Sequence, residues 1–327
     1  MARNKRAWLV GLGALAGLGA VAALRERDIG DPTSDFTAHG FVRRTVATPA
    51  GAMVYYEAGQ GQPLIFLHGI GGGASSWIWS KIAPAFAASY RVIVPDWIGW
   101  GLSEHPQRWL LPEDYVAELD ALLRHVDAPA LVVAQSLAAG FVADLACLKP
   151  ELFVRLVLMA PTGGKDFGRE LSDSVAGKTL KSLARKEPFN QQFYQALFHR
   201  RSFVRSWLVR QGFYDEAAVS DELVNGFLYS ARQPNAAYSA LPFLTGDLRF
   251  DFAVKLRDLN VPAAMIWGAQ EREVGRKTAE QLAAVNPDVP LYFIDRARAT
   301  PELEHPAQTI ALIQRLLTGE AEQERTV

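Results

Sequence analysis

The sequence predicts an α/β fold with a mostly parallel, doubly wound sheet that is interrupted once by a helical insertion. Short apolar and β-branched runs alternate with segments of helical length on both sides of residue 136. This alternation stops between residues 164 and 250 and then resumes. Alternating strands and helices form a parallel sheet with helices on both faces. We therefore expect the binding loops at the carboxyl ends of the strands.

The clearest strand-to-helix junction is centred on Ser136. The β-branched segment 130–134 favours a buried strand, and residues 137–148 have the apolar content and length of a helix. A serine at such a turn lifts its hydroxyl clear of the sheet, beside the free N–H groups of the helix. Ala134 and Ala138 stand where the pattern Gly-x-Ser-x-Gly has glycine. Ser136 is therefore a candidate nucleophile, and capping of the helix is its alternative role.

Two glycine-rich turns precede this serine. A strand at 64–67 leads into His-Gly-Ile-Gly-Gly-Gly, and a strand at 91–94 leads into Pro-Asp-Trp-Ile-Gly-Trp-Gly. Together with the serine turn, these motifs resemble the α/β-hydrolase superfamily. The branch they resemble most contains small esterases, haloperoxidase-like and epoxide-hydrolase-like enzymes and chlorophyll dephytylases. The resemblance extends from about residue 45 to about residue 317.

The resemblance implies roles for several residues. Ser136 is the expected nucleophile, and the backbone N–H groups of Ile70 and Leu137 are the expected oxyanion hole. Where the family has Trp-Gly-x-x-Asp, this sequence has Trp-Gly-Ala-Gln-Glu, so Glu271 takes the place of the acid. Glu273 is a neighbouring alternative. A glutamate can orient a histidine as an aspartate does.

The expected position of the general base has no histidine. The family has Gly-His-x-Pro followed by Glu-x-Pro, and in this frame Ala299 stands where the base belongs. A serine hydroxyl is a poor nucleophile until a base takes its proton. Loss of a triad member leaves only roughly 10³ to 10⁴ of rate over water. His305 and His199 are the alternative base candidates.

Two functions from different classes fit these residues. The first is a membrane-associated serine hydrolase of lipophilic esters, with its base supplied from a non-standard place. The second is a non-catalytic pseudohydrolase that binds a lipophilic ligand or a partner protein at the same site. The sequence does not indicate which of the two applies, nor the oligomeric state of the protein.

Composition excludes several other classes. The net charge of −1 gives no reason to expect nucleic acid as a partner. A single cysteine excludes an internal disulfide bond. No histidine or cysteine spacing matches a metal site, and no glycine loop matches a nucleotide fingerprint, so we expect neither metal nor cofactor.

The N-terminus predicts an attachment to a membrane. Residues 7–24 are uncharged and follow three basic residues, which favours a hydrophobic helix that anchors the chain, within a segment 1–24. The alternative is a cleaved signal peptide and a secreted protein, because Ala-Val-Ala at 20–22 is a possible cleavage site. Residues 25–40 have the composition of a linker.

The remaining chain divides into a core, a cap and a tail. The core is expected at 41–163 and 251–318, the helical cap at 164–250 and a short tail at 319–327. The cap is rich in aromatic residues, which favours a lipophilic small molecule as substrate or ligand. Cations interleaved with apolar residues over 178–210 are typical of contact with anionic lipid.

Overall fold

A computed structural model describes residues 29–32, 34–163 and 175–320 of the chain. The expected N-terminal hydrophobic helix at 7–24 lies outside these residues, as do 164–174 of the expected cap and most of the tail. Within the described ranges, no helix is both long and apolar enough to cross a membrane. The described residues from 31 onward group into one unit.

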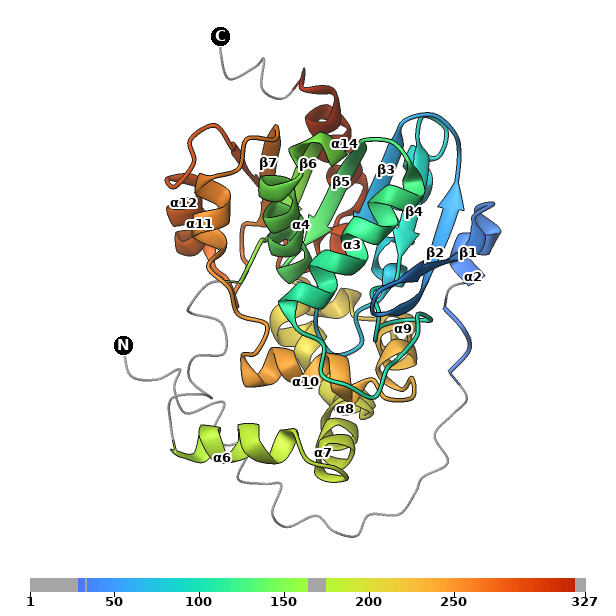
Figure 1. The fold of residues 1–327 in the computed structure, drawn as a ribbon, viewed down its shortest axis with the longest axis vertical. Helices are drawn as coiled ribbons and strands as arrows, with labels where there is room; N and C mark the ends of the chain where they lie inside the picture. Colours follow the sequence, from blue (N-terminus) through green and yellow to red (C-terminus); the bar gives the residue numbers. More distant parts are fainter. Residues whose placement is uncertain (1–28, 33, 164–174, 321–327) are drawn as a thin grey trace. The chain divides into compact units, whose positions relative to one another are not determined.

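The core of the unit is one eight-stranded sheet, which confirms the predicted α/β fold (Figure 1). The spatial order is β1-β2-β4-β3-β5-β6-β7-β8. The first two strands form an antiparallel hairpin, and the pairs from β4 to β8 are parallel. The strands are β1 (Val42–Thr48), β2 (Gly51–Ala58), β3 (Pro63–Leu67), β4 (Arg91–Pro95), β5 (Ala130–Gln135), β6 (Phe153–Met159), β7 (Ala263–Gly268) and β8 (Leu291–Ile294).

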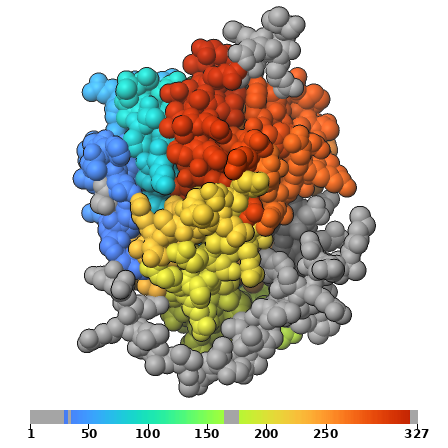
Figure 2. Space-filling view, turned by 180° about the vertical axis from the view of Figure 1, so that it is seen from behind, coloured from blue at the N-terminus to red at the C-terminus, as the bar shows by residue number. Residues whose placement is uncertain are grey.

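Helices cover both faces of this sheet. Helices α3 (Pro112–Val126) and α4 (Leu137–Leu148) lie on one face, and α14 (Pro306–Thr318) lies on the other, where Figures 1 and 2 agree. Every residue of β3, β5 and β7 is buried. Strands of a parallel sheet are covered on both sides, so continuous apolar runs replace the alternation of polar and apolar residues.

The segment after β3 differs from the prediction. The spacing of apolar residues in the sequence predicts a helix near residues 77–87, but the chain forms two 3₁₀ turns, η2 (Ser76–Trp79) and η3 (Ala83–Phe86). Pro84 lies inside the second turn, and proline cannot donate the backbone bond that a longer helix would need there. The two turns bury Trp77 and Trp79, so tertiary packing replaces helical length.

A short helix, α2 (Ser34–Ala38), lies within the segment that the composition predicts to be a linker. Its Phe36 is fully buried and stacks on Tyr56 at 4.8 Å between ring centroids. The apolar contact of one aromatic side chain therefore fixes the end of an otherwise polar segment to the sheet.

The described part of the expected cap, residues 175–250, is helical and contains no strand. It lies between β6 and β7 in the chain, and α11 (Phe252–Arg257), α12 (Arg276–Ala283) and α13 (Pro301–Glu304) follow it. Its helices are α6 (Val175–Ala184), α7 (Phe189–Phe198), α8 (Arg201–Trp207), the π-helix η5 (Leu208–Gly212), the 3₁₀ turn η6 (Glu216–Ala218), α9 (Asp221–Ala231) and α10 (Ala237–Thr245).

Ion pairs inside the cap use part of its basic charge. Asp247 accepts bonds from Lys181 and Arg185, and Asp221 lies against two arginines of α8. These cations hold cap helices together. The expected contact with anionic lipid therefore depends on the cations that remain, which include the exposed Lys186.

Candidate functional site

Ser136 occupies the tight turn between β5 and α4. Its backbone has φ 56° and ψ −129°, a conformation that side-chain-bearing residues rarely adopt. The Ser136 N–H donates to the oxygen of Met159 at 2.8 Å, and its carbonyl oxygen accepts from the N–H groups of Ala139 and Thr162. Its hydroxyl makes no hydrogen bond within the described residues. The turn is thus held by backbone bonds.

The glycine loop after β3 packs directly on this turn. A Cβ placed on Gly69 would lie 3.1 Å from the Cβ of Ser136. The next residue is Ile70, which is buried. Neither the N–H of Ile70 nor that of Leu137 makes a hydrogen bond to any described residue. The structure therefore brings Ser136 and the two expected oxyanion donors together, and neither donor bonds a described residue.

His68 precedes this loop and is fully buried. Its Nδ1 lies 2.7 Å from the oxygen of Gly69, and its Nε2 accepts from the N–H of Trp97 at 3.2 Å. Burial lowers the pKa of His68 to about 4, so the ring is neutral at physiological pH. Both ring nitrogens are used by the backbone, and His68 shapes the loop.

Asp96 follows β4 and is equally buried. Its two carboxylate oxygens accept from the N–H groups of Ser76 at 2.6 Å and Leu102 at 2.9 Å. A Cβ on Gly101 would lie 2.1 Å from the carboxyl carbon of Asp96, so only glycine fits there. These contacts make Asp96 a structural residue of its glycine turn.

Glu271 is the buried acid of the turn after β7, with 8% of its surface exposed. Its Oε1 accepts from the N–H groups of Arg272 at 2.8 Å and Glu273 at 2.7 Å, whereas its buried Oε2 has no partner. Burial is the main cause that raises the pKa of Glu271 to about 7. Glu273 is exposed and accepts from the indole of Trp207. Glu271 is therefore the better candidate for the acid, because it is buried and Glu273 is exposed.

Position 299 lies beside the serine turn. The backbone oxygen of Ala299 accepts from Nε2 of Gln135, the residue before Ser136, at 3.1 Å. The turn that contains it also runs along the end of β7, because a Cβ on Gly268 would lie 2.1 Å from the oxygen of Arg298. The turn that holds position 299 therefore contacts the turns of both the serine and the acid, and position 299 itself is an alanine.

The two alternative bases lie in other surroundings. His305 directly precedes α14, with Nε2 2.8 Å from the oxygen of Arg296 and 3.6 Å from Glu304. His199 follows α7, with its ring edge-on to Tyr194. The six histidines all lie in the described ranges, and none of their ring nitrogens bonds the hydroxyl of Ser136.

Sequence reasoning missed a buried polar pair under the serine turn. Gln135 donates to Oε1 of Glu302 at 3.0 Å, and Oε2 of Glu302 is buried without a partner. Burial raises the pKa of Glu302 to about 8. The two residues are 167 positions apart, so no local spacing could indicate the contact. The only signal in the sequence is a polar residue directly before the candidate nucleophile.

A second missed feature joins the 298–300 turn to the π-helix of the cap. The carbonyl groups at the end of a helix lack partners within the helix. Arg298 donates to the oxygens of Val209 and Arg210, the N–H of Ala299 to Gln211, and the hydroxyl of Thr300 to Gly212. We call residues 298–300 the strap. In Figure 2 the yellow part of the cap, which includes the π-helix, lies directly against the red C-terminal part of the chain.

The cap forms an aromatic roof over the glycine loop. A Cβ on Gly72 would lie 1.9 Å from the ring of Phe198, the last residue of α7. A Cβ on Gly73 would lie 2.4 Å from the backbone oxygen of Phe227 in α9. The loop with the expected oxyanion donor thus faces a phenyl ring at contact distance.

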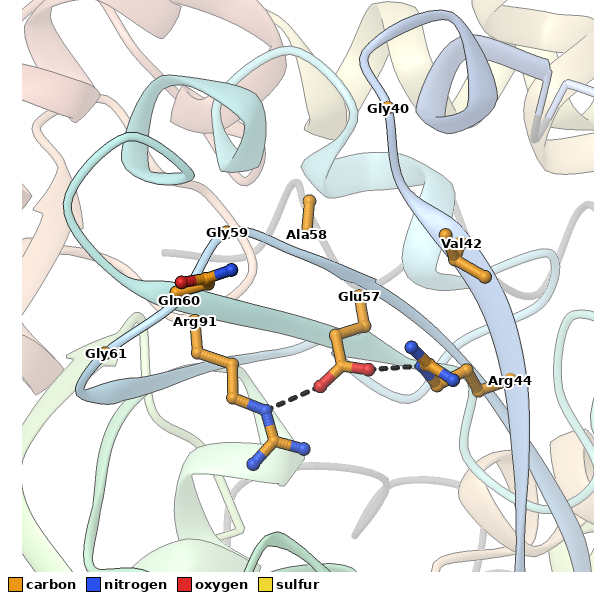
Figure 3. Close-up of a pocket in the computed structure, with 9 residues that line it drawn as sticks. All are labelled: Gly40, Val42, Arg44, Glu57, Ala58, Gly59, Gln60, Gly61 and Arg91. Atoms are coloured by element: carbon orange, nitrogen blue, oxygen red, sulfur yellow. Dashed lines mark hydrogen bonds and ion pairs between the residues drawn. The ribbon is translucent and has the colours of Figure 1, made fainter.

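A groove of about 410 Å³ lies elsewhere, at the amino ends of β3 and β4 (Figure 3). Glu57 bridges Arg44 and Arg91 in it. The amino ends of parallel strands lie at the edge opposite Ser136, so this groove is separate from the site described above. The described residues also contain no cluster of acidic, histidine and cysteine side chains suited to a metal ion.

Comparison with known proteins identifies the family. Residues 62–306 match the family model of the alpha/beta hydrolase fold, so the chain belongs to this family. It is 28% identical to 2-hydroxy-6-oxo-6-phenylhexa-2,4-dienoate hydrolase of Burkholderia cepacia, over 76% of this chain and 85% of the relative. It is 37% identical to 2-hydroxymuconate semialdehyde hydrolase of Pseudomonas sp. (strain CF600), over 33% of this chain and only 39% of the relative.

A solved structure agrees with this assignment. The crystal structure of a serine hydrolase involved in carbazole degradation superposes with a TM-score of 0.70 and 23% identity. The superposition covers 85% of this chain and 99% of the other. At this identity the likeness concerns the fold alone.

Proposed function

We propose that the protein is a non-catalytic member of the alpha/beta hydrolase family that uses the site around Ser136 to bind a lipophilic small molecule. One observation carries the proposal. Ala299 contacts Gln135 beside Ser136, at the position where the base is expected, and no imidazole of the described residues bonds the serine. Without an acceptor for its proton, the serine is a poor nucleophile.

The unused groups around the serine support binding in place of turnover. Ser136, Ile70 and Leu137 offer three donors without partners among the described residues. Phe198 of the cap supplies an apolar ring against Gly72 of the same glycine loop. Sites with an apolar lining and few polar groups are typical of small-molecule binding. The two relatives are named for hydrolysis of small organic molecules, which agrees with a small-molecule ligand here.

The proposal includes attachment to a membrane through residues 7–24. The uncharged run and its basic flank support it. The test is fractionation of cells that express the full chain, followed by alkaline extraction of the membranes. An anchored chain stays in the membrane pellet, whereas a chain found in the medium with a shortened N-terminus would support a cleaved signal.

The proposed lack of catalysis is tested with a fluorescent fluorophosphonate, which reacts with activated serines. The wild-type protein should react with the fluorophosphonate no faster than Ser136→Ala does. Ala299→His should label at least about 100-fold faster, since it supplies a base. Labelling of Ala299→His would also show that the rest of the site is intact. Ala299→His with Ser136→Ala is the matched control and should not label.

Rapid labelling of wild type that Ser136→Ala abolishes would contradict the proposal and support an active hydrolase. In that case His305→Gln and His199→Gln identify the base. The variant that removes labelling while the protein stays folded marks the histidine that acts on Ser136.

A further inference from the structure

The polar groups that converge at Ser136 are hydrogen-bond donors. The N–H groups of Ile70 and Leu137 can only donate, and neither has a partner among the described residues. The Ser136 hydroxyl also has a proton to donate, and position 299 offers only a methyl group in place of an acceptor ring. A ligand that satisfies this site must therefore supply acceptors.

The backbone adds positive potential at the same place. Helix α4 spans twelve residues, begins directly after Ser136 and has no acidic residue in its first turn. The N-terminus of a helix carries roughly half a positive charge and favours anions. The unused N–H of Leu137 belongs to this first turn. Helix and oxyanion loop thus both favour an acceptor next to Ser136.

Two buried acids of the surrounding turns do not oppose an anion: Glu302, which bonds Gln135 beside Ser136, and Glu271 of the turn after β7. Burial raises the pKa of Glu271 to about 7 and that of Glu302 to about 8. Near neutral pH Glu302 is mostly uncharged, and Glu271 is only partly charged. The repulsion that two carboxylates would exert on an anionic ligand is correspondingly weak.

We infer that this site binds the carboxylate of a lipophilic acid, and that it prefers the acid to the corresponding ester. The inference rests on the proposed function and names its ligand class. A carboxylate has two oxygens with about four acceptor positions, enough for all three donors. An ester carbonyl can serve the two N–H groups, but it leaves the serine proton to a weakly basic alkoxy oxygen. The apolar chain would lie against Phe198.

Isothermal titration of the full chain at pH 7 with octanoate, methyl octanoate and octanol tests this inference. The three probes share one chain length and differ in the head group. Octanoate should bind at least about tenfold more tightly than the ester or the alcohol, as expected for charge-assisted hydrogen bonds. Ser136→Ala should weaken the binding of octanoate several-fold and reduce the difference in affinity between octanoate and the ester.

Two further variants distinguish effects on the head group from effects on the alkyl chain. Ser182→Ala, which changes an exposed serine of α6, should bind all three probes as wild type does. Phe198→Ala should weaken the binding of all three probes by a similar factor, because it removes a contact with the alkyl chain that they share. Unfolding curves of each variant identify losses that come from misfolding.

Binding of the ester or the alcohol as tight as that of octanoate would overturn the inference, as would absence of binding by octanoate. An unchanged preference in Ser136→Ala would also overturn it. Release of octanoate from methyl octanoate, followed separately, would instead contradict the proposed lack of catalysis. The two failures therefore give different results.

Discussion

The side-chain amide of Gln135 donates to the carboxyl group of Glu302 at 3.0 Å, directly beneath the serine turn. This bond connects the end of β5 to α13, the four-residue helix after position 299. The carboxyl is fully buried and one of its oxygens has no partner. An ionised carboxylate in such a place costs far more than a neutral one. The pair therefore makes the stability of the fold depend on pH.

Glu302→Gln should remove part of this pH dependence. The folded pKa of about 8 lies above the ordinary value of 4.5, so between these values the folded protein holds a proton that the unfolded chain has lost. The free energy of unfolding contributed by Glu302 therefore falls as pH rises, by at most about 1.4 kcal/mol per pH unit. Urea unfolding from pH 5 to 9 measures it, and Glu302→Gln should gain stability relative to wild type as pH rises.

Glu151→Gln changes an exposed glutamate and is the control for this series. Its stability should follow that of wild type at every pH. Parallel curves for wild type and Glu302→Gln would mean that Glu302 is ionised in the folded protein, contrary to the effect of its burial.

The strained backbone of Ser136 predicts a second stability difference. A side chain at φ 56° and ψ −129° costs about 1 to 3 kcal/mol, and glycine relieves this cost. Ser136→Gly should therefore be more stable than Ser136→Ala by about 1 kcal/mol, after the greater flexibility of glycine in the unfolded chain is subtracted. Chemical denaturation of the two variants gives the difference. A Ser136→Ala protein as stable as Ser136→Gly would show that the turn relaxes.

Arg298→Met should loosen the π-helix of the cap. Methionine keeps much of the length of the side chain but leaves the oxygen of Val209 without its donor and that of Arg210 with only Arg272. Losing these partners costs about 1 to 3 kcal/mol. Hydrogen exchange of the amides of η5 and the residues that follow should become faster.

Arg272→Met is the matched control for the strap. It removes one bond to the oxygen of Arg210 from an exposed arginine, while Arg298 keeps that oxygen bonded. Its effect on exchange should be small. Equal acceleration in both variants would show that the buried arginine has no special part in fixing the cap.

The sequence predicts local structure and order along the chain better than long-range polar contacts. The turn at Ser136 was predictable because valines, small residues and a helical run are adjacent in sequence. The pairing of Gln135 with Glu302 was not, since it depends on how the end of β5 meets the distant helix α13. The two 3₁₀ turns around Trp77 were also missed, because burial of indole rings outweighs helical length there. The role of Arg298 could not be predicted from the sequence, because its partners are backbone oxygens, which every residue has.

Gly72→Ala should destabilise the protein through the aromatic roof. The added methyl would lie 1.9 Å from the ring of Phe198, so the ring must move, which costs about 1 to 3 kcal/mol. Gly71→Ala is the control, because its methyl would meet nothing within 4 Å. In a double-mutant cycle, Phe198→Ala should make Gly72→Ala nearly neutral. If Gly72→Ala costs the same with and without Phe198, the ring does not lie on the glycine loop in solution.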